Sequence, residues 1–192
     1  MGRFTREELL AHRGAGVPDL LGPDLRLLFV GINPGLWTAA VQAHFAHPGN
    51  RFYPALLAGG VIDRPIRVSA GMTPADQAYF TGRGLGITNL VPHTTARAAE
   101  VTAADLKAGR RRLEQLVAAR QPKVVAVAGI TAFRQAFGRR WAVLGRQPEQ
   151  IGEAELWVVP NPSGLNAHEN IRSLAAAYRA AAMAAGVISQ TP

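Results

Sequence analysis

The stretch LRLLFVGINPG, residues 25–35, carries the clearest structural signal in the chain. Its first six residues form a short apolar run, which predicts a strand inside the protein. Gly31 and Gly35 then permit a tight turn and a close approach of a ligand to the backbone, while Pro34 stiffens the turn. Asn33 adds an amide that both donates and accepts hydrogen bonds. A buried strand that ends in a polar, glycine-containing loop is therefore the starting point for the fold.

Similar apolar runs follow along the chain, and helical patterns separate them. Strands are predicted at residues 86–91, 123–128 and 156–159, and the segment 139–151 is a candidate for a short additional strand. Helices are predicted at 50–58, from 73–74 onward, at 102–120, at 131–137 and at 167–184, with Thr102 as an N-cap and Asp105 three residues later. Strands that alternate with helices predict an α/β fold with a mostly parallel sheet covered on both faces.

The length of 192 residues predicts a single domain, 1–192, with a core at about 25–184 and a loose tail after Val187. No apolar run approaches the roughly 20 residues of a membrane helix, and the N-terminus lacks the apolar centre of a signal peptide. We expect a cytoplasmic protein that does not bind membranes.

Charge and cysteine content narrow the function further. Ten of the 21 basic residues fall within 106–146, where Glu114 is the single acidic residue. Such a one-sided field suits a polyanion such as nucleic acid, although a solvated helix face would have the same pattern. The absence of cysteine excludes disulfides, thiolate-bound zinc and a cysteine nucleophile, and the five histidines show no metal-ligand spacing. We expect no metal site.

Three unusual loops follow predicted strands: GINPG at 31–35, TNLVPHTT at 88–95 and NPSGLNAH at 161–168. Ligands bind at the carboxyl ends of parallel strands, so these loops are expected to form the site. No Asp or Glu occurs at 31–62, 82–99 or 156–167. Hydrolysis there would depend on an oriented water and on stabilisation of a leaving anion. Leu165, at the tip of a turn, fits either a wedge for a base stack or a loop leucine that folds back into the core.

Four motifs in this order, GINPG, FAHPGNRF at 45–52, GITNLV at 86–91 and NPSGL at 161–165, resemble the mismatch-specific uracil-DNA glycosylase and thymine-DNA glycosylase family. The resemblance covers about 27–178. It implies a three-layer α/β/α sandwich with a central four- or five-stranded sheet, and a monofunctional glycosylase without a cofactor. It also implies a monomer that acts on double-stranded DNA with a mismatched or damaged base, in the bacterial cytoplasm and associated with the nucleoid through DNA binding.

The resemblance assigns roles residue by residue. Asn33 matches the residue that positions the attacking water, and Phe45 matches the aromatic that stacks on the flipped base. The expected base-binding residues are Ile32, Thr38, Phe45 and Asn89, and the expected DNA-binding residues are Asn161, Ser163, Gly164 and Leu165.

The chain departs from the family pattern at a few positions. Trp37 stands where a small residue is usual, and Asn166 and Ala167 follow the wedge where some relatives have an arginine that contacts the opposite strand. The more active uracil-DNA glycosylases use an Asp and a His at the positions of Asn33 and Asn161, so slow chemistry is expected.

The predicted activity is removal of uracil, or a related mismatched or modified pyrimidine, which leaves an abasic site for base excision repair. Two other functions fit the same residues. One is hydrolysis of a free nucleoside or nucleotide, which would not need Leu165. The other is a non-enzymatic module that binds DNA lesions, which the missing carboxylate makes conceivable.

Overall fold

The computed structural model describes residues 4–96 and 100–189. In it, five strands form one sheet in the order β2-β1-β3-β5-β4. These are β1 (Leu27–Gly31), β2 (Leu85–Asn89), β3 (Val124–Ala128), β4 (Gly145–Ile151) and β5 (Ala154–Val159). The first three and β5 are parallel, whereas β4 is antiparallel to β5. The mostly parallel sheet is confirmed, and the segment 139–151 does contain the additional strand.

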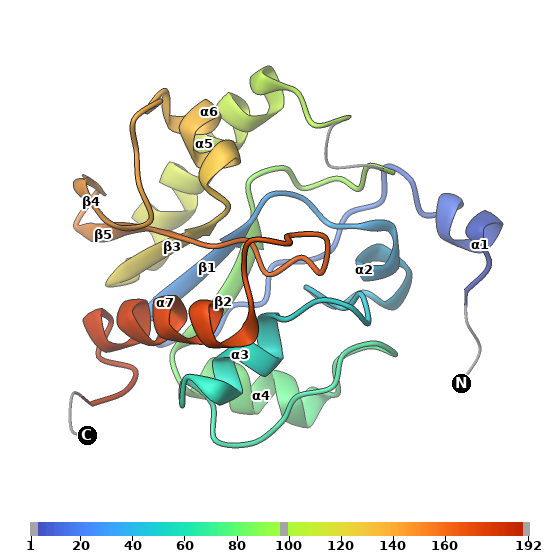
Figure 1. Cartoon of the computed structure of the whole chain (residues 1–192), viewed down its shortest axis with the longest axis horizontal. Coiled ribbons are helices and arrows are strands. Elements are labelled where there is room, and N and C mark those ends of the chain that lie inside the picture. Colours follow the sequence, from blue (N-terminus) through green and yellow to red (C-terminus); the bar gives the residue numbers. More distant parts are fainter. Residues whose placement is uncertain (1–3, 97–99, 190–192) are drawn as a thin grey trace.

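Helices cover both faces of this sheet, which gives the expected three layers (Figure 1). One layer contains α5 (Ala103–Arg120) and α6 (Ile130–Phe137), and the other contains α3 (Phe52–Ala58), α4 (Pro74–Gly82) and α7 (Ile171–Ala184). Side chains of β1 alternate between the two cores. Leu27 and Phe29 pack with Phe52 and Tyr178, while Leu28 and Val30 join the core under α5 and α6. This alternation along a buried strand fixes the register of the sheet between its helices.

Most predicted helices are confirmed, with small shifts at their ends. Thr102 caps α5 and forms a capping box with Asp105, as the sequence indicates. Helix α7 begins at Ile171 rather than at 167, because the Asn170 side chain accepts a hydrogen bond from the Ser173 backbone and caps the helix there. Two short helices, α1 (Arg6–Leu10) and α2 (Leu36–Val41), were not predicted.

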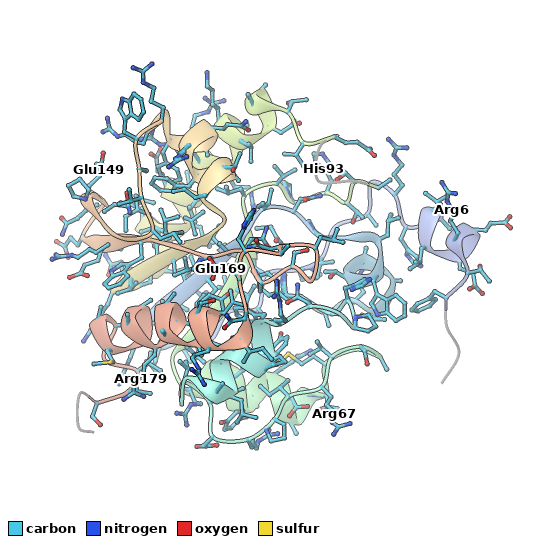
Figure 2. The ribbon with its side chains drawn as sticks, viewed as in Figure 1. Arg6, Arg67, His93, Glu149, Glu169 and Arg179 are labelled. Carbon is cyan, nitrogen blue, oxygen red and sulfur yellow. The ribbon has the colours of Figure 1, made fainter. Side chains whose placement is uncertain are left out.

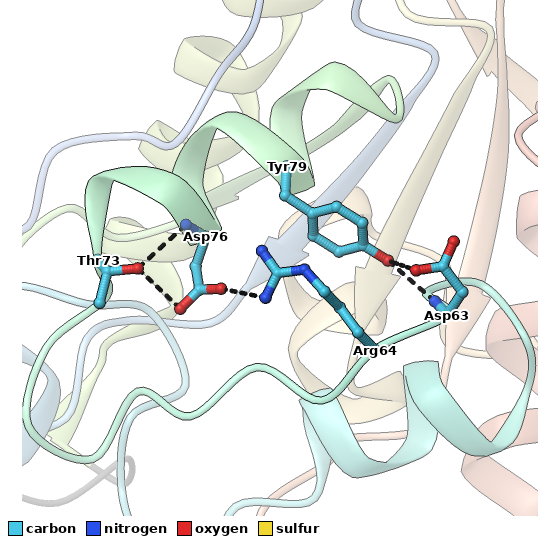
Figure 3. A network of polar contacts seen from close by, with 5 residues as sticks. All are labelled: Asp63, Arg64, Thr73, Asp76 and Tyr79. Carbon is cyan, nitrogen blue, oxygen red and sulfur yellow. Dashed lines mark hydrogen bonds and ion pairs between the residues drawn. The ribbon is translucent and has the colours of Figure 1, made fainter.

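A polar network fastens the segment before α4 to that helix (Figure 3). Thr73 caps the helix and also donates to Asp76, whose carboxylate binds the Arg64 guanidinium at 2.6 Å. Arg64 lies over the ring of Tyr79, and the Tyr79 hydroxyl donates to Asp63 at 2.6 Å. These contacts stabilise the layer that contains α3, α4 and α7. None of the five residues lines the cavity of the candidate site.

Two further predictions concern the C-terminal tail and the absence of a membrane-spanning helix. Val187 and Ile188 pack against the core beside α7, and the rest of the predicted tail, 190–192, lies outside the described residues. None of the helices in the described part of the chain is long and apolar enough to cross a membrane.

Candidate active site

The loops after β1, β2 and β5 meet at the carboxyl edge of the sheet and enclose a cavity of about 660 Å³. All nine residues that the sequence assigned to the site line this cavity: Ile32, Asn33, Thr38, Phe45, Asn89, Asn161, Ser163, Gly164 and Leu165. The described lining residues include no carboxylate and no Lys or Arg. Among the lining residues that the structure describes, polar groups such as those of Asn33, Asn89 and Asn161 stand in a largely apolar wall, in agreement with the lack of Asp and Glu in the three loops.

The carboxamide of Asn33 is held in one orientation. Its Nδ2 atom donates to Oγ1 of Thr95 at 2.8 Å and to the Pro34 carbonyl at 3.2 Å. Among the described residues, no donor occupies its Oδ1 atom. Because the nitrogen is engaged, the oxygen is the atom that can accept a hydrogen bond from a water in the cavity.

The ring of Phe45 forms an aromatic wall of the cavity. It stacks on Phe52 with 4.2 Å between ring centroids and an angle of 26° between planes, so the hydrophobic core supports it from behind. The Phe45 backbone has a φ of 55°, a left-handed conformation that is uncommon for a residue with a bulky side chain. Such strain persists only where the surroundings enforce it, and here it directs an aromatic ring to the cavity.

Asn89, at the end of β2, is held by a chain of hydrogen bonds through His44. Nε2 of His44 lies 2.9 Å from the Pro18 carbonyl, which can only accept, so Nε2 carries the proton. Burial lowers the pKa of His44, against the opposing effects of the Pro18 carbonyl and the Asp19 charge, so the ring is neutral at pH 7. Its Nδ1 atom is then an acceptor for Nδ2 of Asn89, at 3.3 Å.

Oδ1, the other polar atom of the Asn89 amide, therefore faces the site. A Cβ atom on Gly31 would collide with Oδ1 of Asn89 and would lie 3.4 Å from the Phe45 ring. Oδ1 of Asn89 therefore packs on Gly31, and this fixed acceptor lies beside the edge of the Phe45 ring. A planar ring with an N–H group on its edge fits this arrangement.

The loop after β5 carries the most exposed hydrophobic side chain of the described residues, Leu165, with 96% of its surface accessible. Two turns shape the loop: the Ser163 backbone donates to Oδ1 of Asn161 at 2.9 Å, and the Asn166 side chain donates to the Asn161 carbonyl at 3.1 Å. Arg51 binds three carbonyls of the same loop. Leu165 is thus an apolar side chain displayed to solvent on a well-ordered turn.

Sequence reasoning missed three residues that organise the site: His44, Arg51 and Thr95. All three stand in or beside motifs that the sequence analysis quoted, but their partners lie on loops distant in the chain. His44 was considered only as a metal ligand, and among residues 4–96 and 100–189 no cluster of three metal-ligating side chains exists. Neither His93 nor His168 lines the cavity.

The basic segment 106–146 spans most of α5, β3, α6 and the start of β4, and none of its ten basic side chains is among the residues that line the cavity. Six of its ten basic side chains bind carboxylates or backbone carbonyls of the protein: Arg110, Arg112, Arg120, Arg134, Arg139 and Arg146. Part of this charge therefore stabilises the fold, and its use in DNA binding stays a prediction.

Comparison with known proteins agrees with this arrangement. Residues 18–182 match the model of the uracil DNA glycosylase superfamily. A solved structure with the same fold is the solution NMR structure of a candidate uracil DNA glycosylase from Methanosarcina acetivorans. It is 15% identical, with a TM-score of 0.56 over 90% of this chain and 96% of that chain. The match of the family model over most of the sequence shows that the chain belongs to the uracil DNA glycosylase superfamily.

Proposed function

We propose that this chain is a monofunctional, mismatch-directed DNA glycosylase. It flips uracil, or a related mismatched or modified pyrimidine, out of duplex DNA and hydrolyses the N-glycosidic bond with an oriented water. The observation that carries the proposal is the fixed carboxamide of Asn33, whose Nδ2 is engaged by Thr95 at 2.8 Å in a cavity whose described lining residues include no carboxylate. Its Oδ1 atom accepts a hydrogen bond from the water and directs it to C1′ of the sugar.

The chemistry follows from the lack of carboxylates among the described lining residues. As the C1′–N1 bond breaks, its electron pair leaves with the base, which departs as an anion, and the sugar gains oxocarbenium character. The water oxygen then bonds to C1′ and its proton passes to solvent. Because no described lining residue has a carboxylate to take that proton, the reaction is dissociative, and its rate depends on water placement and on the hydrogen bonds that hold the base. Slow turnover is the expected consequence.

Base recognition is assigned to Phe45 and Asn89. The flipped ring stacks on Phe45, and Oδ1 of Asn89 accepts from the N3–H group of uracil or thymine. Cytosine presents an unprotonated nitrogen at that position, so two acceptors would face each other. Ile32 and Thr38 close the remaining walls of the pocket.

Selection of mismatches is assigned to the DNA rather than to a base-specific contact. Unpairing costs least at a mismatch, so the weaker pair flips more readily. Leu165 fills the gap that the flipped nucleotide leaves, while Asn161, Ser163 and Gly164 shape the loop against the backbone phosphates. An apolar side chain that is 96% exposed has no evident use in hydrolysis of a free nucleoside, so this feature favours a duplex substrate.

Single-turnover base release tests the proposal. Labelled DNA carries U·G, U·A, T·G or single-stranded U, and the wild type is compared with Asn33→Ala. Gln115→Ala, which truncates an exposed amide of α5, is the matched control. We expect release from U·G that falls at least about a hundredfold in Asn33→Ala, as for loss of a transition-state contact of about 3 kcal/mol.

Other outcomes would replace the proposal. Binding to the mismatch without release would favour the lesion-binding module. Release from free nucleotides that Leu165→Ala leaves unchanged would favour a nucleotide hydrolase. Intact uracil release by Asn33→Ala would refute the water-positioning role alone.

A further inference from the structure

Arg51 occupies the centre of the loop formed by residues 160–170, here called the Leu165 loop. Its Nη2 atom donates to the carbonyls of Ser163 at 2.5 Å and of Asn166 at 2.9 Å. Its Nη1 atom donates to the carbonyl of Glu169 at 2.5 Å, just before α7, where Figure 2 labels Glu169. The Arg51 backbone also donates to the Pro162 carbonyl at 3.0 Å.

This set of partners is unusual for a guanidinium group. Among the described residues no carboxylate forms an ion pair with Arg51, and its Nε atom is buried without a hydrogen-bond partner. The positive charge is therefore balanced by backbone carbonyl dipoles of one loop. Three carbonyls of a short loop repel one another when they point to a common centre, so this loop conformation depends on the cation between them.

A second contact holds the same loop at Gly164. Gly164 lies against the backbone of Gly49, and a Cβ atom at Gly164 would lie 2.5 Å from the Gly49 carbonyl oxygen. The segment 49–51 thus contacts the Leu165 loop at Gly164 through packing and at three carbonyls through Arg51. The Leu165 side chain itself is 96% exposed, so its direction is set by this backbone and by no packing of its own.

We infer that Arg51 is a positioning residue that pre-organises the Leu165 wedge for insertion into duplex DNA. This inference rests on the proposed function. Arg51 does not line the cavity, so it acts through the loop rather than on the base. Without its fork of donors the loop samples other conformations, and the activity on duplex falls to the fraction of molecules whose loop remains competent.

The test compares Arg51→Met and Arg51→Lys with the wild type. Lysine keeps the charge but lacks the planar fork, so it cannot bind three carbonyls in this geometry. Arg179→Met is the matched control. Like Arg51, Arg179 donates to a backbone carbonyl, in this case that of Gly59, but it lies on α7 beyond the end of the Leu165 loop (Figure 2). We expect both Arg51 variants to lose about tenfold in single-turnover release from U·G duplex, with single-stranded uracil release within about twofold of the wild type.

A double-mutant cycle identifies the route of the effect. If Arg51 acts through the wedge, Arg51→Met has little further effect on duplex release in a Leu165→Ala background. Arg51→Lys keeps the positive charge, so the comparison of duplex with single strand stands even if Arg51→Met fails to fold. Hydrogen exchange of amides 163–169 reports the loop directly, and we expect protection to fall there in both Arg51 variants.

Several results would overturn the inference. Wild-type behaviour of Arg51→Lys would assign the effect to charge rather than to the loop. Equal losses on duplex and single strand, or effects additive with Leu165→Ala, would show that Arg51 does not act through the wedge. If the wild type released no base at all, the proposed function would fail, while unchanged exchange in Arg51→Lys would still refute the positioning role independently.

Discussion

Nδ1 of His44 lies 3.3 Å from Nδ2 of Asn89, and this contact determines which atom of the Asn89 amide faces the cavity. The determinant is remote from the base. The Pro18 carbonyl fixes the proton on Nε2 of His44, the unprotonated Nδ1 accepts from Asn89, and Oδ1 is left toward the site. A backbone carbonyl near the N-terminus thus sets the hydrogen-bonding character of a pocket at the end of β2.

Replacement of His44 tests this chain of contacts. In His44→Leu the Asn89 amide loses its fixed partner and can turn, so we predict a loss of about five- to tenfold in kcat/KM for uracil release, as for one hydrogen bond of about 1–1.5 kcal/mol. His44→Gln keeps an acceptor and a donor and should lose less. Equal activity of the leucine variant and the wild type, measured on U·G duplex, would show that Asn89 needs no such orientation.

The same histidine makes activity and stability depend on pH. Because burial lowers the pKa of folded His44, the unfolded chain takes up the proton first as pH falls. Its contribution to stability is present above the ordinary histidine pKa and is lost as pH falls toward and through the lowered folded value. Protonated Nδ1 also cannot accept from Asn89, so uracil release should fall only as pH passes through the lowered folded pKa of His44.

Urea unfolding at pH 7.5 and pH 5.5 measures this dependence, and His44→Gln is the control because it has no proton to gain. The variant should lose less stability than the wild type over this interval. The carboxyl groups of Asp76 and Asp105, whose pKa values are lowered mainly by hydrogen bonds from Arg64 and Thr102, lose their contributions only at lower pH. An identical pH slope in both proteins would contradict the assignment to His44.

Thr95 is predicted to act through Asn33. Thr95→Val removes the acceptor at 2.8 Å from Nδ2 of Asn33, so the amide is less firmly oriented, and we expect about a fivefold fall in the single-turnover rate. Thr95→Ser retains the hydroxyl and should be close to the wild type. In an Asn33→Ala background the valine substitution should have little effect, and full additivity would argue for a separate role of Thr95.

The sequence predicted the sheet, the larger helices and the position of the site because these follow from local patterns. Apolar runs such as 25–30 identify strands that are buried on both faces, and Thr102 with Asp105 marks the start of α5 before any tertiary contact is known. The short helices α1 and α2 were not predicted, because each is shorter than two helical turns and has too little periodic pattern to identify a helix.

The contacts that orient the site residues could not be predicted in the same way. Arg51 donates to carbonyls of residues more than a hundred positions away in the chain. Every residue has a backbone carbonyl, so the sequence does not indicate which of them Arg51 binds. Asn89 and His44 depend on a tautomer that only the Pro18 carbonyl determines. Motifs located the residues, but their orientation is a property of tertiary structure.

Gly31 offers a way to block the pocket without harming the fold. Its φ does not require glycine, and alanine is tolerated at the end of a buried strand at least as well. The added Cβ atom would collide with Oδ1 of Asn89 and lie 3.4 Å from the Phe45 ring, so it would displace the amide assigned to base recognition. We predict that Gly31→Ala loses at least about tenfold in uracil release, as for a misplaced reacting group.

The matched control for this variant is Gly82→Ala, in α4, where a Cβ atom would meet nothing within 4 Å. Alanine in that helix should leave activity unchanged and should stabilise the protein by up to about 1 kcal/mol. Thermal unfolding and binding to an abasic duplex should show that Gly31→Ala is folded and still contacts DNA, because Leu165 and its loop are untouched. Uracil release at the wild-type rate by Gly31→Ala would mean that the position of the Asn89 amide does not matter for binding the base, and the assignment of base recognition to Asn89 would have to be abandoned.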